Sequence, residues 1–248
     1  MLVDRSALPQ IWSSLKAAAH ANADTPTVLL LASHSIDSIA SVRILSRLLE
    51  EEGVPHKVVP VSDYADLSRV YARQIVSASE LRSIFLINCG GIVDLMGHFQ
   101  SVLDEDDGTK ASEPRRATDL PHPDCRWYVL DSHRPYALEN IYVDGSEDSP
   151  HNVCVIHDGE QNGDLDDILA QLPILFDASD RDDSDDEEDP PAQRRRVTLG
   201  EYGAMSPDSR RDRRRVLKRM TRRYYSASWH GTATSVLCYS LVQVCASM

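Results

Sequence analysis

Continuous apolar runs alternate with helical periodicity along the first 160 residues. Thr27–Ala32 is an apolar run typical of a strand covered on both faces. Apolar residues from Ile39 to Leu49 then recur at helical spacing up to Gly53, a natural helix stop. A second helical pattern lies at 67–75, and further strand-like runs lie at 56–62, 83–88, 126–131 and 152–157. This order predicts an α/β fold with a mainly parallel sheet.

Polar residues follow three of these runs: Ser33 to Asp37, Asn88 to Gly90, and Asp131-Ser132-His133. Parallel sheets bind ligands beyond the carboxyl ends of their strands, so we expect these turns to converge. An Asp with a His two residues later can bind one divalent metal. An isolated pair of this kind is, however, more often a turn in which the Asp caps backbone N–H groups.

The second half of the chain is strongly segregated in charge. Residues 177–191 contain nine acidic residues and one Arg, a composition that predicts disorder. Twelve Lys or Arg and three acidic residues lie between Arg194 and Arg223. Ser206 followed by Pro207 predicts the start of a strongly basic helix. The polar segment 103–124 predicts a loop.

The basic residues have two functional interpretations and one structural alternative. They could bind nucleic-acid phosphates or form a nuclear-import patch. Alternatively, the helix is solvated and balances the acidic segment, where Ser179 and Ser184 are hypothetical phosphorylation sites. The candidate residues are Arg194, Arg195, Arg196, Arg210, Arg211, Arg213, Arg214, Arg215, Lys218 and Arg219.

The composition bears on the ligand class and on the cellular compartment in which the protein is expected. Twenty-six Lys and Arg against 39 Asp and Glu give a net charge of −13, which argues against a simple nucleic-acid binder. Five cysteines without a C-x-x-C pair, and an N-terminus too polar for a signal peptide, predict a nuclear or cytosolic protein. The apolar run near the end is about half of a membrane span.

The last segment predicts an apolar helix after Gly231, with a face formed by Val236, Leu237, Tyr239 or Ser240, and Val244. Two interpretations remain open. The chain is cut short relative to its natural architecture, or this helix docks on the chain's own sheet.

Several stretches together resemble the cell division control protein 45 family, replication factors related to the Asp-His-His (DHH) phosphoesterases and RecJ-type exonucleases. The resemblance covers about residues 25–245 and is carried by "LLLASHSIDSIASVRILSRLL", "VPVSDYADL", "FLINCGGIVDL", "LDSHRPYALENIYV" and "YYSASWHGTATSVL". It implies a DHH-like α/β domain over 1–175, an acidic disordered insertion over 176–205, a basic helix over 206–223 and a returning helix over 224–248. It also implies that the chain is truncated, with a helical interdomain and a second α/β domain missing.

The resemblance further implies a degenerate site. Active DHH enzymes bind two divalent ions through several Asp and His residues. At the matching positions this chain has Asp37, Asn88 in place of an Asp, and Asp131 and His133 with Ser132 between them in place of a His. We therefore expect no catalytic residue, no metal and no cofactor. From the residues alone, Asp37 could cap a helix N-terminus and His133 could form a hydrogen bond within its turn.

The implied function is that of a non-catalytic DNA replication initiation and fork factor in the nucleus. Its expected partners are the minichromosome-maintenance hexamer, the GINS complex and chromatin at replication origins, with single-stranded DNA as a secondary ligand and no membrane. One alternative is a metal-dependent phosphodiesterase or single-strand exonuclease using Asp37, Asp131 and His133. Another is an interaction module whose acidic segment binds basic partners such as histones.

Overall fold

We describe the chain from a computed structural model. It describes residues 1–21, 25–106, 125–141, 152–159, 165, 168–169 and 206–245. The acidic segment 177–191, the phosphorylation candidates within it and Arg194 to Arg196 lie outside these residues. The chain divides into two compact units, Met1–Gly159 with Trp229–Met248, and Glu160–Ser228.

Six parallel strands form the sheet of the first unit, in the order β1-β7-β5-β4-β2-β3. The strands are β1 Leu2–Val3, β2 Val28–Ser33, β3 His56–Val61, β4 Ser83–Ile87, β5 Arg126–Leu130 and β7 Val153–Ile156. The predicted α/β class and parallel sheet are confirmed. β3 lies at the edge, as Pro60 suggests.

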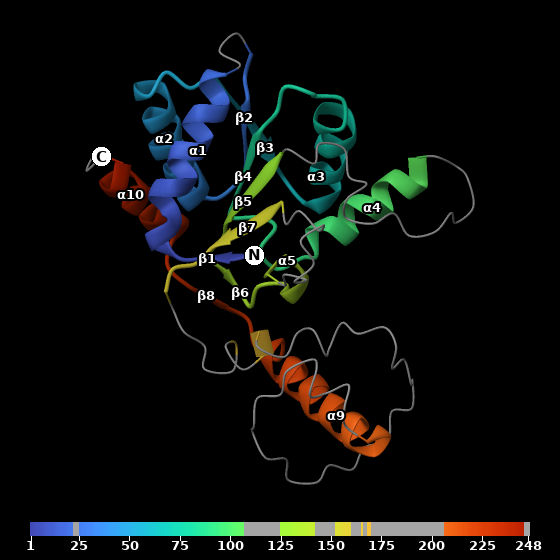
Figure 1. Cartoon of the computed structure of the whole chain (residues 1–248). Coiled ribbons are helices and arrows are strands. Elements are labelled where there is room, and N and C mark those ends of the chain that lie inside the picture. The colour runs from blue at the N-terminus through green and yellow to red at the C-terminus, as the bar shows by residue number, and fades with distance from the viewer. Residues whose placement is uncertain are drawn as a thin grey trace. The chain divides into compact units, whose positions relative to one another are not determined.

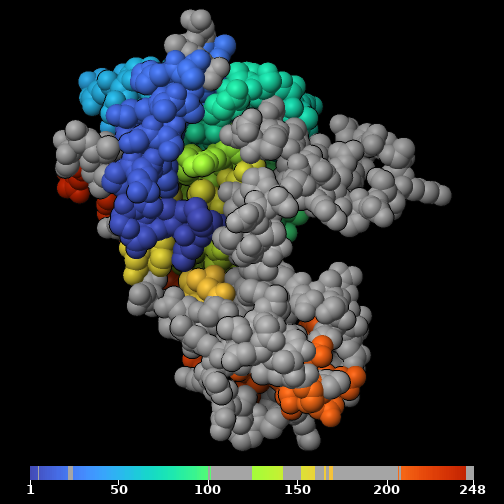
Figure 2. Space-filling view, viewed as in Figure 1, coloured from blue at the N-terminus to red at the C-terminus, as the bar shows by residue number. Residues whose placement is uncertain are grey.

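Helices cover both faces of the sheet (Figure 1). One layer contains α1 Leu8–His20, α2 Ile36–Glu51 and α10 Thr234–Cys245. The other contains α3 Tyr64–Val70, the π-helical turn Tyr71–Ile75, α4 Leu95–Asp106 and α5 Leu138–Ile141. In the space-filling view, sheet atoms in green and yellow show between α1 (blue) and α3 (teal) (Figure 2).

Each layer has its own apolar core because successive strand residues point to opposite faces. Trp12, Leu45 and Leu237, from three helices, pack with alternate residues of β2, β4 and β5 on the first face. On the second face the Tyr71 ring stacks on Phe99 with centroids 4.1 Å apart, and Phe99 lies 5.0 Å from Trp127. Helices held by such contacts fix the positions of the turns that leave the sheet.

The loop predicted at 103–124 is wrong at its start, because α4 continues to Asp106. Leu95 and Phe99 are fully buried one turn apart and anchor this helix. The apolar residues Leu95, Met96, Phe99, Val102 and Leu103 recur at helical spacing, so the helical pattern extends into the start of the segment that its polar residues assigned to a loop. Residues 107–124 lie outside the described part of the chain.

α10 packs on α2 and α1, as in the second of the two interpretations of the last segment. Its buried face is Leu237, Cys238 and Leu241, whereas Val236 is 49% exposed. The predicted face is therefore right at Leu237 and wrong at Val236 and Tyr239, while the side chain of Val244 lies outside the described residues. No helix in the described ranges combines the length and apolarity needed to cross a membrane.

The second unit contains α9, Pro207–Tyr224, which confirms the predicted basic helix. Ser206 is the N-cap, and its Oγ accepts a hydrogen bond from the Ser209 N–H at 3.3 Å. A separate two-stranded antiparallel ribbon, β6 His133–Arg134 with β8 Trp229–His230, belongs to the first unit.

Candidate functional site

The candidate site lies where the sheet reverses its order. From β2 the chain moves outward to β3, and from β4 it moves the other way to β5, so the carboxyl ends of β2 and β4 form a switch point. A cavity of about 180 Å³ opens here. Its lining includes Ser33, Tyr64, Asn88, Cys89, Asp131 and His133.

Asn88 is the centre of the site. It is buried and has a φ of 52°, a left-handed conformation that Asn tolerates better than most residues. Its side-chain NH₂ donates to Asp37 Oδ2 at 2.8 Å and to Ser38 Oγ at 3.2 Å. Its Oδ1 accepts from the Ser132 backbone N–H at 3.2 Å, the Ser132 hydroxyl at 3.0 Å and the Thr234 hydroxyl at 2.6 Å. An amide is needed because both a donor and an acceptor are in use.

Asp37 accepts hydrogen bonds from another helix. Its Oδ2 accepts from the Thr234 N–H at 2.8 Å and its Oδ1 from the Ser235 N–H at 3.0 Å, both at the start of α10. The N-cap of α2 is Ser35, whose hydroxyl accepts from the Ser38 N–H. Asp37 therefore caps a helix N-terminus, as the residues led us to expect, but the helix is α10 and not α2, in which Asp37 itself lies.

These contacts change the acidity of Asp37. Partial burial pushes the pKa of its carboxyl upward, but hydrogen bonds from Ser235, Asn88 and Thr234 outweigh burial and hold the pKa below its ordinary value. The ionised carboxylate is thus the form that the fold stabilises.

This lowered pKa gives a pH-dependent prediction. The stabilisation is fully present above the unfolded-state pKa of about 3.9, and it is lost as the pH falls through the lower folded-state pKa. In urea unfolding, the stability gap between the wild type and Asp37→Asn should be largest near neutral pH and should shrink below about pH 4. A gap that stays constant into the acid range would contradict this assignment.

Asp131 is 1% exposed and is paired on both carboxylate oxygens. Its Oδ1 accepts from the His133 backbone N–H at 3.0 Å and lies 2.6 Å from His133 Nδ1, while its Oδ2 accepts from the Gly91 N–H at 2.9 Å. The hydrogen bond to Asp131 raises the pKa of the His133 imidazole despite partial burial. The bond expected for His133 within its turn is thus present. A Cβ on Gly91 would lie 2.8 Å from Asp131 Oδ2, so this close approach requires glycine.

The segment from β8 to the start of α10, residues 229–235, contributes to the site and is called the returning segment below. The Gly231 N–H donates to the Ser132 carbonyl at 2.8 Å, and the Thr234 hydroxyl reaches Asn88. A Cβ on Gly231 would lie 2.5 Å from Asp158 Oδ2. Residues almost 200 positions apart in sequence therefore share one polar network.

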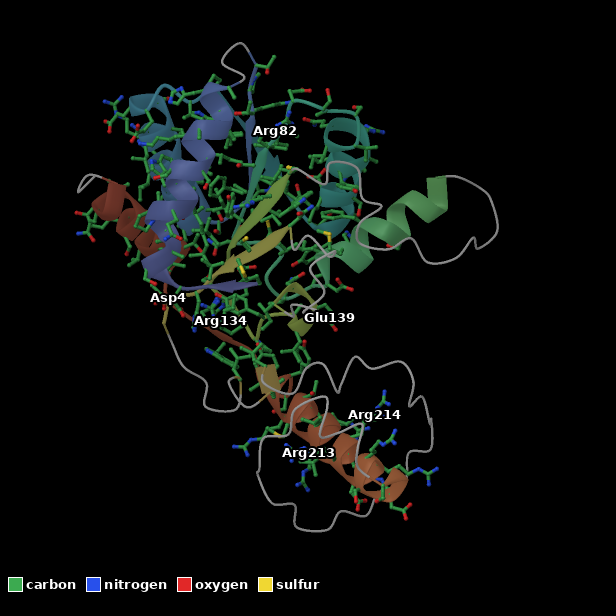
Figure 3. The ribbon with its side chains drawn as sticks, in the orientation of Figure 1. Asp4, Arg82, Arg134, Glu139, Arg213 and Arg214 are labelled. Atoms are coloured by element: carbon green, nitrogen blue, oxygen red, sulfur yellow. The ribbon has the colours of Figure 1, made fainter. Side chains whose placement is uncertain are left out.

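A buried ion pair anchors the same segment. Arg134 Nη2 lies 2.7 Å from Asp158 Oδ2, with the two side chains 5% and 0% exposed. Arg134 Nη1 also donates to the backbone carbonyls of Asp131 and His133, and Asp158 Oδ2 accepts from the Thr232 N–H at 2.9 Å. Figure 3 shows Arg134 at the end of the sheet, near β1.

The structure brings together all five site residues predicted from the sequence: Asp37, Asn88, Asp131, Ser132 and His133. Sequence reasoning missed the roles of Thr234, Arg134 and Asp158. The signal for Asp158 was its position after the strand run at 152–157, and Arg134 and Thr234 lie within the quoted motifs. Cys89 also lines the cavity, but burial raises the pKa of its thiol to about 12, which keeps it protonated.

The candidate residues of the basic patch that the structure describes all lie on α9: Arg210, Arg211, Arg213, Arg214, Arg215, Lys218 and Arg219. Arg211, Lys218 and Arg219 are exposed, and Arg215 lies 3.8 Å from Asp212. Arg213 and Arg214 project to different sides of the helix (Figure 3). α9 thus presents cations around much of its circumference.

Comparisons with known proteins identify the family. The sequence model of the CDC45 family matches residues 28–189, which is more than half of the chain. The chain therefore belongs to the CDC45 family. Its CDC45 relatives include the cell division control protein 45 homologues of Schizosaccharomyces pombe, 30% identical over 139 residues, and Dictyostelium discoideum, 31% identical over 133 residues.

These matches cover 56% and 54% of this chain but 18% and 17% of the two relatives. The chain thus spans less than a fifth of the length of these curated CDC45 proteins. The crystal structure of CDC45 from Entamoeba histolytica is also similar, with a TM-score of 0.48 and 25% sequence identity, covering 64% of this chain and 26% of that one.

Proposed function

We propose that this CDC45-family chain is a non-catalytic DNA replication initiation and fork factor that works by assembly. On this proposal it joins the minichromosome-maintenance hexamer and GINS at origins in the nucleus and holds them in one geometry. Family membership supports the replication role. The observation that carries the non-catalytic part is that Asn88 and the carboxylates of Asp37 and Asp131 use their polar atoms on neighbouring protein groups.

The donor set does not fit the two divalent ions that active DHH enzymes hold. Such ions need several anionic oxygens that face a common open volume. Asn88 instead points a hydrogen-bond donor at Asp37, and Asp131 is turned toward Gly91 and His133. Within the described ranges no group of three or more His, Cys, Asp or Glu is placed to hold an ion.

Single-stranded DNA is a secondary ligand on this proposal. The cations of α9 would contact phosphates, with an affinity that falls steeply with salt. The exposed Arg211, Lys218 and Arg219 support this role, although the net charge of −13 opposes non-specific binding by the chain as a whole.

Assembly can be tested with purified components. The full chain is mixed with the minichromosome-maintenance hexamer and GINS from the same organism and analysed by size-exclusion chromatography. We expect the chain to co-elute with them and to do so equally well when Asp131 is replaced by Asn in a folded variant. Elution of the chain alone under all conditions would contradict the proposal.

Catalysis is tested separately. Incubated with labelled single-stranded DNA and millimolar Mn²⁺ or Mg²⁺, the wild-type chain should release no nucleotides above a no-protein control. The reason is that the site lacks the anionic oxygens needed to position metal ions at a scissile phosphate. Mn²⁺-dependent release that Asp131→Ala abolishes would establish the phosphodiesterase alternative instead.

A further inference from the structure

Two histidines face each other across the β6–β8 ribbon, outside the Asp37–Asn88 network. His133 of β6 and His230 of β8 are direct cross-strand partners. The hydrogen bond from the Gly231 N–H to the Ser132 carbonyl makes the adjacent residues a hydrogen-bonded pair. His133 and His230 therefore occupy a non-hydrogen-bonded position, where opposing side chains approach most closely.

The spacing of the two rings fits a shared metal ion. Their centroids are 4.9 Å apart and their planes are inclined by 55°. With a metal–nitrogen distance of about 2.1 Å, two imidazoles on one ion place their centroids about 4.5 Å apart at a right angle and about 5.2 Å apart at the tetrahedral angle. The observed separation of 4.9 Å lies between these values.

The orientation of His133 also suits coordination. Its Nδ1 is engaged by the buried Asp131 carboxylate at 2.6 Å, which directs the Nδ1 proton to Asp131 and leaves the Nε2 lone pair as the ligand atom. A carboxylate behind the imidazole is the usual second partner of metal-binding histidines and increases their basicity. Both side chains are accessible, since His133 is 44% exposed and His230 is exposed.

We propose that His133 and His230 form a binding site for one transition-metal ion of the Zn²⁺ or Ni²⁺ type, which fastens β6 to β8. Imidazole selects such ions over Mg²⁺ and Mn²⁺. No third His, Cys, Asp or Glu of the described residues joins them, so water completes the coordination. The bound ion links the strand that leaves the Asp131 turn to the segment that leads into α10.

The site is tested by calorimetric titration of the full chain with ZnCl₂ and NiCl₂ at pH 8, because protons compete with a metal ion for histidine nitrogens less strongly at alkaline pH. The variants are His230→Asn and His133→Asn, the latter keeping a side-chain N–H near Asp131. His34→Asn removes an exposed histidine in the turn after β2 and serves as the matched control. Circular dichroism of each variant verifies its fold.

We expect one ion of Zn²⁺ or Ni²⁺ per chain, a melting temperature that rises with added Zn²⁺, and no response to Mg²⁺. Each of His133→Asn and His230→Asn should weaken binding at least about tenfold and abolish the rise in melting temperature, because half of the protein ligands are lost. His34→Asn should behave as the wild type. Absence of binding, binding that both variants retain, or equal binding of Mn²⁺ would overturn the proposal.

Discussion

Replacing Asn88 with Asp is expected to lower the free energy of unfolding by about 3 kcal/mol at pH 8. The change removes the side-chain N–H group that donates a hydrogen bond to Asp37 Oδ2 at 2.8 Å, and it places a second carboxylate beside Asp37. Two carboxylates at this distance cannot both ionise without strong repulsion, so one of them must take up a proton. The Thr234 and Ser132 donors remain for the new carboxylate and offset part of the loss.

The destabilisation should depend on pH in a defined direction. A carboxyl whose pKa is raised in the folded state binds more protons when the chain is folded than when it is unfolded. The stability of Asn88→Asp should therefore improve, relative to the wild type, as the pH falls from about 8 to about 5. Urea unfolding at several pH values measures this difference.

A charge swap provides the matched control. The double variant Asn88→Asp with Asp37→Asn restores one carboxylate and one amide to the pair and should recover part of the lost stability, because the amide at position 37 can accept only one of the two backbone N–H groups of α10. Millimolar Mn²⁺ should stabilise Asn88→Asp, which has regained an anionic oxygen, and leave the wild type unchanged. If Asn88→Asp were as stable as the wild type at pH 8, the role given to the Asn88 amide would be wrong.

Replacing Arg134 with Met is expected to cost about 3–5 kcal/mol of unfolding free energy. Asp158, whose side chain is fully buried, would lose its cation, and two backbone carbonyls would lose the donor that now serves them. Breaking one half of a buried pair leaves an uncompensated charge, which costs far more than losing an exposed pair. Chemical unfolding monitored by tryptophan fluorescence measures the difference.

Two comparisons separate the ion pair from loss of side-chain volume. Arg47→Met breaks an exposed pair with Glu51, in which Arg47 is 70% exposed, and should cost less than about 0.5 kcal/mol. The double variant Arg134→Met with Asp158→Asn should lose less unfolding free energy than the sum of the two single variants, since no unpaired buried carboxylate is then left at position 158. A cost for Arg134→Met as small as that for Arg47→Met would refute a structural role for the pair.

The sheet was predictable because its strands are buried on both faces and are therefore continuous apolar runs in the sequence. Val28–Ser33 and Ser83–Ile87 are examples, and each differs from its predicted run by one residue at most at either end. The end of α4 was assigned to a loop because Asp104, Glu105 and Asp106 open a polar segment, although the apolar residues from Leu95 to Leu103 recur at helical spacing. The face of α10 was misjudged because the sequence does not reveal that α10 packs on α2 and α1.

The position of the candidate site could be predicted from the sequence, but the hydrogen-bond partners of its residues could not. Strand order alone brings the turns after β2, β4 and β5 together. The partners of Asp37 come from Thr234 and Ser235, almost 200 residues away, and no local pattern predicts a hydrogen bond over that distance. The same holds for the pair between Arg134 and Asp158, whose burial follows from the returning segment.

The hydrogen bonds of the Asp131 carboxylate indicate a structural role in which Asp131 connects two turns of the chain. Its carboxylate orders the glycine turn after β4 through the Gly91 N–H and fixes His133 beside β8. A metal ion bound to these oxygens would have to displace both partners, and the loss of two charge-assisted hydrogen bonds opposes that exchange.

The most direct measurement is the number of Mn²⁺ ions that the wild-type chain binds at Asp131, located by anomalous diffraction from a crystal soaked in millimolar MnCl₂. The account predicts no pair of ions there, with Asp131 still bonded to Gly91 and His133. Two ordered ions bridged by Asp131 would contradict it.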